Sequence, residues 1–378
     1  MNRQLKLKLN KTQEQTLEQW LWHLTAVYNW AIRKIELDAN DKIYYSAYDF
    51  NNILANHSKK IGIPSHVIHG ILMQGYTAWK RYFKKVSGKP RLKGNRNKLN
   101  SVPFPDPFKS PEDNKIGILG LGKVRFHKQD IPEGKIKCGR IIKKASGWYL
   151  QLTIDVKNKF SVKETTETIG IDPGFKTLLT LSNGIKIDNP RELRKGEKRI
   201  AQAQRGRNKK LTARLQEKQA NRRKDRNHKI SRSLIEDYQT IFYSNDNFKN
   251  LAKINGKSVS EASLGQLIRM ITYKGSMCGR DVIPVDSRFT TMTCSVCGSL
   301  TGPHGRDGLA VRHWECSACG ADHDRDINSA KVVLNAGVGA TLKDSEMNQL
   351  TGISITNDRK VQIYSLDMMI YTCQKVEI

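Results

Sequence analysis

Four cysteines in the second half of the chain restrict its fold more than any other feature. Cys294 and Cys297 are separated by two residues, as are Cys316 and Cys319, and eighteen residues lie between the pairs. This spacing is typical of a closed four-sulfur Zn²⁺ site, which is structural. Four free thiols or redox disulfides are the weaker alternatives. We therefore predict a zinc ribbon over residues 291–320.

Acidic residues occur at two points that favour metal-dependent chemistry. Ile169 and Ile171 alternate around a glycine, so we expect a strand that ends at Asp172. An acid at this position is poorly placed for a core and well placed to reach into a cleft. Asp324 and Asp326 stand at the start of an expected helix after the cysteines. Carboxylates from a strand end and a helix start suit Mg²⁺-dependent phosphoryl transfer, which uses ions about 4 Å apart.

The charge balance favours a polyanionic partner. The chain of 378 residues has 65 Lys and Arg against 36 Asp and Glu, for a net charge of +29. Charge for solubility alone would not need so strong an excess of one sign, so nucleic acid is the first candidate. The length is enough for roughly two or three domains.

Secretion and membrane insertion are not expected from the sequence. We find no signal peptide and no long apolar run. The remaining cysteines, Cys138, Cys278 and Cys373, are scattered, as in a protein kept reduced. We therefore expect a cytoplasmic protein without a membrane partner.

The motifs GIDPG, CxxC…CxxC and HDRDINSA together resemble the TnpB family, transposon-encoded RNA-guided nucleases related to type V CRISPR effectors. The resemblance covers almost the whole chain. It implies a RuvC-like nuclease with three acids in the order Asp, Glu, Asp, in which Asp172 is the first and Asp326 the third. It also implies guide RNA and double-stranded target DNA as partners, with the protein a monomer or a dimer on the RNA.

The fold implied by this resemblance is α/β. A split RNase H-like (RuvC) domain with a zinc-ribbon insertion follows an N-terminal β-barrel wedge, into which a helical recognition bundle is inserted. The expected boundaries are 1–10 and 88–165 for the wedge, 11–87 for the recognition helices, 166–290 and 321–342 for the RuvC-like domain with a basic helical hairpin at 191–232, 291–320 for the zinc ribbon, and 343–378 for a C-terminal tail.

The second acid of the family, a glutamate, is missing from both of its expected positions. In most relatives it ends a strand before a segment like NFKNLAK, where this chain has Ser244. In other relatives of this kind it comes from a later strand, where this chain has Ser287. Three displaced acids remain as candidates: Asp246, Asp286 and Glu261. The simplest interpretation of Glu261 is an exposed residue near a helix N-terminus.

Basic residues that could contact phosphate are concentrated in two segments. Residues 191–232 contain 17 Lys and Arg against 4 Asp and Glu, an imbalance that repels itself unless an anion neutralises it. A Gly-, Pro- and Lys-rich loop near residue 90 is the second segment. The expected contacts are Lys89, Arg91, Lys93, Arg205, Arg207, Lys209, Lys210, Arg222, Arg223, Lys224 and Arg226.

Two functional hypotheses follow. In the first, the chain pairs a guide RNA with DNA beside a short adjacent motif and represses transcription without cleaving, as nuclease-dead TnpB derivatives do. In the second, it is an active Mg²⁺-dependent endonuclease with a displaced acid. A basic nucleic-acid-binding protein without a guide is a weaker third. Zn²⁺ is expected in the first two, and Mg²⁺ only if the nuclease is active.

Overall fold

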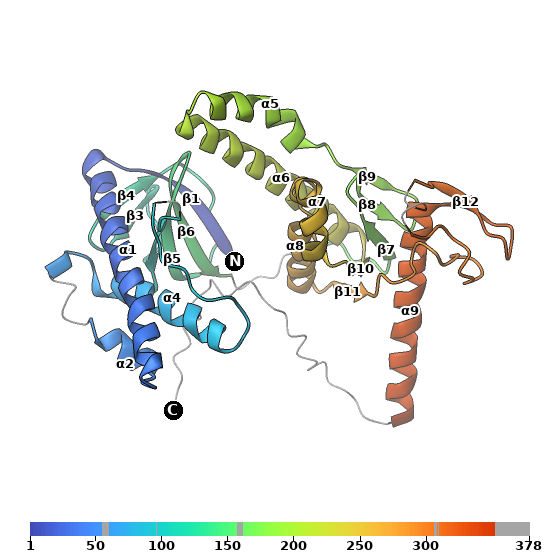
Figure 1. Cartoon of the computed structure of the whole chain (residues 1–378), viewed down its shortest axis with the longest axis horizontal. Helices are drawn as coiled ribbons and strands as arrows, with labels where there is room; N and C mark the ends of the chain where they lie inside the picture. The colour runs from blue at the N-terminus through green and yellow to red at the C-terminus, as the bar shows by residue number, and fades with distance from the viewer. Residues whose placement is uncertain (55–59, 96, 157–161, 306–307, 309, 352–378) are drawn as a thin grey trace. The chain divides into compact units, whose positions relative to one another are not determined.

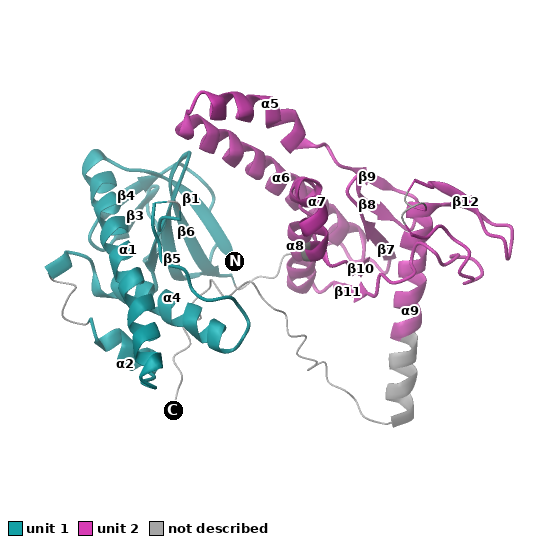
Figure 2. Ribbon diagram, viewed as in Figure 1, with its two compact units in different colours: residues 1–158, 362–378 teal, residues 159–361 magenta. Residues whose placement is uncertain are grey.

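The structure is a computed structural model, and its described residues divide into two compact units, Met1–Asn158 and Lys159–Val361 (Figure 2). The described residues are 1–54, 60–95, 97–156, 162–305, 308 and 310–351. Each unit has its own buried core. Among these residues, no helix combines the length and apolar character needed to cross a membrane.

The first unit is built on an antiparallel sheet with the strand order β2-β5-β6-β1-β4-β3 (Figure 1). Its strands are β1 (Asn2–Lys8), β2 (Ser101–Phe104), β3 (Lys115–Ile118), β4 (Gly122–Phe126), β5 (Lys135–Lys144) and β6 (Gly147–Asp155). The N-terminal strand β1 lies between β6 and β4, and its alternating leucines, Leu5 and Leu7, are buried. The order ends at β2 and β3, and no pairing among the described strands joins those two ends into a closed barrel.

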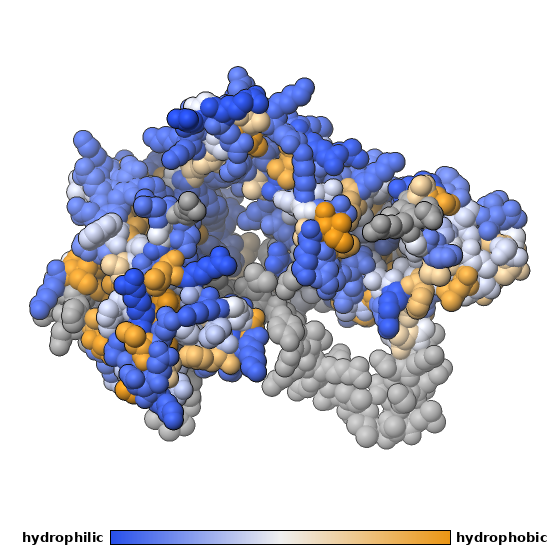
Figure 3. Space-filling view, viewed as in Figure 1, coloured by the Kyte–Doolittle hydropathy of each residue, from blue (hydrophilic) through white to orange (hydrophobic). Residues whose placement is uncertain are grey.

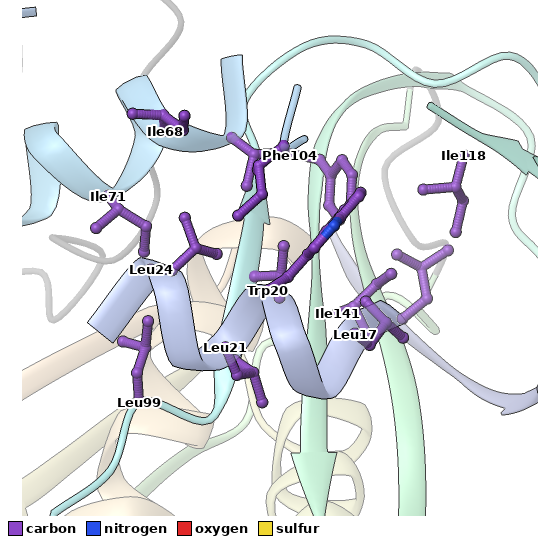
Figure 4. Close-up of a cluster of buried hydrophobic side chains, with 14 of the residues drawn as sticks. Leu17, Trp20, Leu21, Leu24, Ile68, Ile71, Leu99, Phe104, Ile118 and Ile141 are labelled. Carbon is purple, nitrogen blue, oxygen red and sulfur yellow. The ribbon is translucent and has the colours of Figure 1, made fainter. Parts of the chain in front are cut away.

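Helices cover this sheet and complete the first core. They are α1 (Lys11–Asn40), α2 (Ala47–Asn52) and α4 (Ser65–Phe83), and α1 packs against α4. Helix α1 begins with a capping box between Asn10 and Gln13. Its buried residues recur at helical spacing, and the side chains of Leu17, Trp20 and Leu24 point into the cluster with residues of α4 and the sheet (Figure 4).

The second unit contains a sheet with the strand order β11-β10-β7-β8-β9. Its strands are β7 (Thr168–Pro173), β8 (Thr177–Leu181), β9 (Lys186–Asp188), β10 (Thr240–Ser244) and β11 (Asp281–Val285). Strands β7, β10 and β11 are parallel, whereas β8 and β9 run antiparallel to their neighbours. The carboxyl ends of β7, β10 and β11 therefore lie at the same edge of the sheet.

Five helices and a small hairpin surround this second sheet in the described residues. The helices are α5 (Glu192–Arg205), α6 (Lys209–Asp237), α7 (Phe248–Ala262), α8 (Leu264–Cys278) and α9 (Arg325–Thr351), and β12 (His313–Glu315) pairs with β13 (Asp322–Asp324). Helices α5 and α6 form a hairpin (Figure 1) where the sequence predicted one.

The contact between α9 and β7 fixes the acidic residues of both elements. Gly170 in β7 is required here, because a Cβ atom would lie 2.3 Å from the backbone oxygen of Ala330 in α9. Helix α9 continues without a break through residue 343, where the sequence predicted the start of a tail. The rest of that predicted tail, from residue 352, lies outside the described residues.

Candidate active site and metal centre

Two neighbouring parallel strands bring Asp172 and Ser244 together. Tyr243 in β10 pairs with Ile171 in β7, so the residue after each lies at the same edge of the sheet. Ser244 is 1% exposed, and its hydroxyl donates a hydrogen bond to Asp172 Oδ1 at 3.2 Å. The position where the family resemblance places a glutamate is therefore beside the first acid, and serine occupies it.

Asp246 reaches the same hydroxyl from just beyond the end of β10. Its Oδ2 lies 3.4 Å from Ser244 Oγ, and Ser287 also hydrogen-bonds to its carboxylate. A hydroxyl has one proton, so Ser244 donates to one of the two carboxylates at a time. Ser244 and Ser287, the two positions at which the resemblance implies a glutamate, thus both hydrogen-bond to Asp246.

Burial and the neighbouring carboxylates raise the pKa of Asp172. Burial raises the pKa of Asp172 from 3.8 to about 7, and the charges of Asp246 and Asp326 add to the rise, while the Ser244 hydrogen bond and Arg325 oppose it. Burial also raises the pKa of Asp246, against hydrogen bonds from Ser287 and Ser244. The site therefore crowds acids in a poorly solvated place, a pattern found at functional sites and also in structural networks.

The third acid, Asp326, is positioned by the start of α9. Asp324 caps this helix, because its Oδ1 accepts hydrogen bonds from the backbone N–H groups of Asp326 and Ile327, both at 3.1 Å. Lys186 in β9 lies 2.7 Å from the other oxygen of Asp324. Asp324 is thus used in capping and in an ion pair, whereas the charge of Asp326 acts on Asp172.

Two arginines partly neutralise Asp326. Its Oδ1 lies 3.3 Å from Arg325 Nη2 and 3.6 Å from Arg312 Nη1. A guanidinium next to a carboxylate lowers the free energy of the charged form. Arg325 and Arg312 therefore supply positive charge beside the carboxylate of Asp326.

The other two candidate acids have partners of their own. Asp286 is exposed, and Arg288 Nη2 lies 2.6 Å from its Oδ2, which lowers the pKa of Asp286. The interpretation of Glu261 as an exposed residue is wrong: it is 2% exposed, and Arg194 holds it by its Nε at 3.1 Å and its backbone N–H at 3.1 Å. Burial is tolerated because the carboxylate is paired and hydrogen-bonded.

The four cysteines converge as their spacing predicts. All four Sγ atoms lie within 4.8 Å of one another, with Cys294 to Cys319 at 3.8 Å and Cys297 to Cys316 at 3.6 Å. A tetrahedral Zn²⁺ with Zn–S bonds of about 2.3 Å places its sulfurs about 3.8 Å apart, so the group fits a zinc ion. A hydrogen bond with Thr301 lowers the pKa of Cys316 to about 6, whereas hydrogen bonds with the other cysteines and burial raise the pKa of Cys319 to about 12.

The acids do not converge in the same way. Within the described part of the chain, the cysteines are the sole group of three or more His, Cys, Asp or Glu side chains whose ligand atoms are close enough to share an ion. The charges of Asp246 and Asp326 act on Asp172, but these three described carboxylates form no comparable cage.

The basic hairpin exposes most of its predicted phosphate contacts. The exposed residues are Arg205, Arg207, Lys209, Lys210, Arg222 and Lys224, and Arg223 is half-buried. The surface over α5 and α6 is mostly hydrophilic (Figure 3). The hairpin thus presents much of its positive charge to solvent.

Arg226 departs from this pattern, because its guanidinium is held by partners within the unit. Its side chain is 11% exposed, because Nη1 lies 3.2 Å from Glu192 Oε2 and Nη2 donates to the carbonyl oxygen of Ala262 at 2.8 Å. It joins α6 to the start of α5 and the end of α7. Arg226 is therefore a structural residue of this unit.

The second basic segment lies along α1. Lys89 and Arg91 are exposed, and Lys89 Nζ lies 2.5 Å from Glu36 Oε1. The backbone of Lys93 exchanges two hydrogen bonds with the Asn29 side chain, at 2.7 and 2.9 Å. The loop therefore has a fixed path, a feature that its composition did not predict.

Comparison with known proteins identifies the family. A family model described as "Cas12f1-like, TNB domain" matches residues 265–333, and one described as "Probable transposase" matches residues 151–255. A "Putative RNA-guided DNA endonuclease" of Streptomyces pristinaespiralis is 32% identical over 289 residues, which cover 70% of this chain and 69% of the relative. The chain belongs to the TnpB family.

More distant relatives agree with this assignment. The TnpB-family chain is 25% identical over 316 residues to the "Putative RNA-guided DNA endonuclease InsQ" of Escherichia coli strain K12, covering 76% of this chain and 77% of InsQ. Cas12f1, solved as a "Cas12f1-sgRNA-target DNA complex", aligns with a TM-score of 0.55 and 14% identity over 85% of this chain and 82% of that one. At this identity, the likeness establishes a shared mixed α/β fold.

Proposed function

We propose that this TnpB-family chain is an RNA-guided DNA-binding protein that holds its target and represses transcription without cutting. The observation that carries the proposal is Ser244, whose hydroxyl occupies the space between Asp172 and Asp246. A serine hydroxyl is neutral and a poor ligand for Mg²⁺, which prefers carboxylates. The donor set at this edge of the sheet therefore does not fit the pair of ions that in-line hydrolysis needs.

Guide RNA and duplex DNA are proposed as partners because relatives are named RNA-guided DNA endonucleases and because Cas12f1 shares the fold. The charge of +29 and the exposed cations of the α5–α6 hairpin support this choice. Neither the net charge nor the exposed cations of the hairpin depend on the carboxylates of Asp172, Asp246 and Asp326. Loss of cleavage would therefore leave binding intact, and the paired strands would read the target sequence.

The proposed domain assignment rests on the second sheet. The strand order of this sheet is β9-β8-β7-β10-β11, with β9, β8 and β7 antiparallel in turn and β10 and β11 parallel to β7. This order supports a RuvC-like unit with Asp172 on its central strand, β7. The cysteine cluster lies in the segment between β11 and α9. Bound Zn²⁺ would fold this segment and so help to position Asp326.

The deciding experiment uses the protein purified with its own RNA. Matched duplex DNA is offered with Mg²⁺, and gel shift and strand cleavage are recorded for wild type, Asp172→Ala and Ser244→Glu. We expect guide-dependent binding by all three and no cleavage by wild type. Cleavage by wild type that disappears in Asp172→Ala would overturn the proposal, whereas cleavage gained by Ser244→Glu would identify the serine as the cause.

An active Mg²⁺-dependent endonuclease is the second candidate, and one observation favours it. The charge of Asp246 raises the pKa of Asp172, so a carboxylate two residues beyond the expected position acts on the same site. In this case wild type cleaves, and Asp246→Asn abolishes cleavage. Asp286→Asn is the matched control, because that carboxylate is paired with Arg288 and should not matter.

A further inference from the structure

Helix α1 has one face that is not used by the core. Trp20 and Leu21 point into the hydrophobic cluster (Figure 4), but the adjacent Trp22 is 71% exposed. At 3.6 residues per turn, positions 18, 22, 29, 33 and 36 lie on the same face of the helix. Each of the other five tryptophans is buried or half-buried, so Trp22 is the outlier.

The basic loop at residues 89–93 runs along this face of α1, starting near the C-terminal end of the helix. Lys89 pairs with Glu36 at 2.5 Å, and four residues later the backbone of Lys93 pairs with Asn29. Lys93 Nζ then lies 5.5 Å from the centre of the Tyr28 ring. Because Asn29 is seven residues from Trp22, the lysine is anchored about 10 Å along the helix from the indole.

A second lysine flanks Trp22 on the other side. Lys143 in β5 forms an ion pair with Glu18, one turn before Trp22, and its Nζ lies 5.5 Å from the Trp148 ring centre. The two acids on this face, Glu18 and Glu36, are thus already paired with lysines. Exposed Arg33 and Arg91 add positive charge near the same face.

We propose that Trp22 is a stacking platform for an unpaired base of a bound single strand whose phosphates contact the flanking basic residues. An exposed indole between cations combines the two elements of single-strand binding: a flat apolar surface for the base and positive charge for the backbone. Stacking is tolerant of sequence because every base offers a flat face. Net positive charge along the face disfavours a second copy of this equally basic chain as the occupant.

This inference deepens the proposed function, since it names single-stranded nucleic acid as the ligand of a separate surface. It requires neither cleavage nor its absence. The assay therefore uses a short single-stranded oligouridylate and the full chain freed of its RNA. Affinity and tryptophan fluorescence are measured across a series of salt concentrations for wild type, Trp22→Leu and Trp22→Phe.

We expect Trp22→Leu to bind roughly tenfold more weakly, with the salt dependence unchanged because the phosphate contacts remain. Trp22→Phe should recover most of the affinity, since a ring is retained. Oligouridylate should quench the fluorescence of wild type more than that of either variant. Leu37→Ala, which removes another exposed apolar side chain of α1, is the matched control and should leave affinity unchanged.

Equal affinity of wild type and Trp22→Leu would overturn the inference, as would a dimer of the wild type that Trp22→Leu converts to a monomer. Failure of the proposed function is a separate result. It would appear as cleavage of matched duplex by wild type, or as no guide-dependent binding, whatever Trp22→Leu does with the single strand.

Discussion

Replacing Asp172 with asparagine should stabilise the protein at alkaline pH. Burial and the charges of Asp246 and Asp326 raise its pKa from 3.8 to about 7 in the folded state. The folded protein therefore binds this proton more tightly than the unfolded chain does. The resulting stabilisation is fully present below pH 3.8 and is lost progressively as the pH rises to about 7.

The size of the effect follows from the shift. A change from 3.8 to about 7, at about 1.4 kcal/mol per pKa unit, lowers the free energy of unfolding by at most about 4 kcal/mol above pH 7. Asparagine has nearly the same shape, can accept the hydrogen bond from Ser244 and is neutral at every pH. Asp172→Asn should therefore exceed wild type in stability by up to about 4 kcal/mol at pH 8 and by little at pH 4.

Urea denaturation followed by circular dichroism, in a chelator of divalent cations, measures this difference across the pH range. Asp286→Asn is the control, because Arg288 lowers the pKa of that carboxyl and its loss should give no gain at pH 8. Parallel pH profiles for wild type and Asp172→Asn would refute the reasoning. So would a gain in Asp172→Asn that is largest at acidic pH.

Three further changes test the surrounding structure. Ser244→Ala should lower the free energy of unfolding by about 1–3 kcal/mol, because the half-buried carboxylates of Asp172 and Asp246 lose the one donor that they share; thermal denaturation measures it. Cys316→Ser should abolish stoichiometric zinc in the purified protein, determined by metal analysis, whereas Cys278→Ser, outside the cluster, should retain one zinc ion per chain. Gly170→Ala should lower the denaturation midpoint strongly, because its methyl would lie 2.3 Å from a backbone oxygen of α9, while Gly256→Ala meets no atom within 4 Å and should be neutral or stabilising.

The cysteine cluster was predictable because its members are encoded by local spacing. When two residues separate the cysteines of a pair, almost any tight turn brings their sulfurs together. Only one tertiary contact, between the two pairs, is then needed to complete the cluster. The structure brings all four sulfurs within 4.8 Å. The helical hairpin was predictable for a similar reason, since charge and apolar periodicity along residues 191–232 are properties of adjacent turns.

The environment of the acids was not predictable in the same way. The family resemblance predicted that Ser244 and Ser287 stand in place of the glutamate, but not that both hydrogen-bond to Asp246. Sequence reasoning also made Glu261 an exposed residue, although Arg194, 67 positions earlier, holds it in the interior. Partners supplied by distant segments leave no signal in the local pattern.

The amino-acid sequence by itself determined the family, the four clustered cysteines and the excess of positive charge, because motifs, spacing and composition are fixed before folding. Tertiary structure decided how those residues are used. Arg222 and Arg226 occur in one basic run, yet only Arg226 becomes a buried link between helices. Ser244 meets Asp172, 72 residues away, because two parallel strands end at one edge of a sheet, and this shared edge sets the charge state of the site.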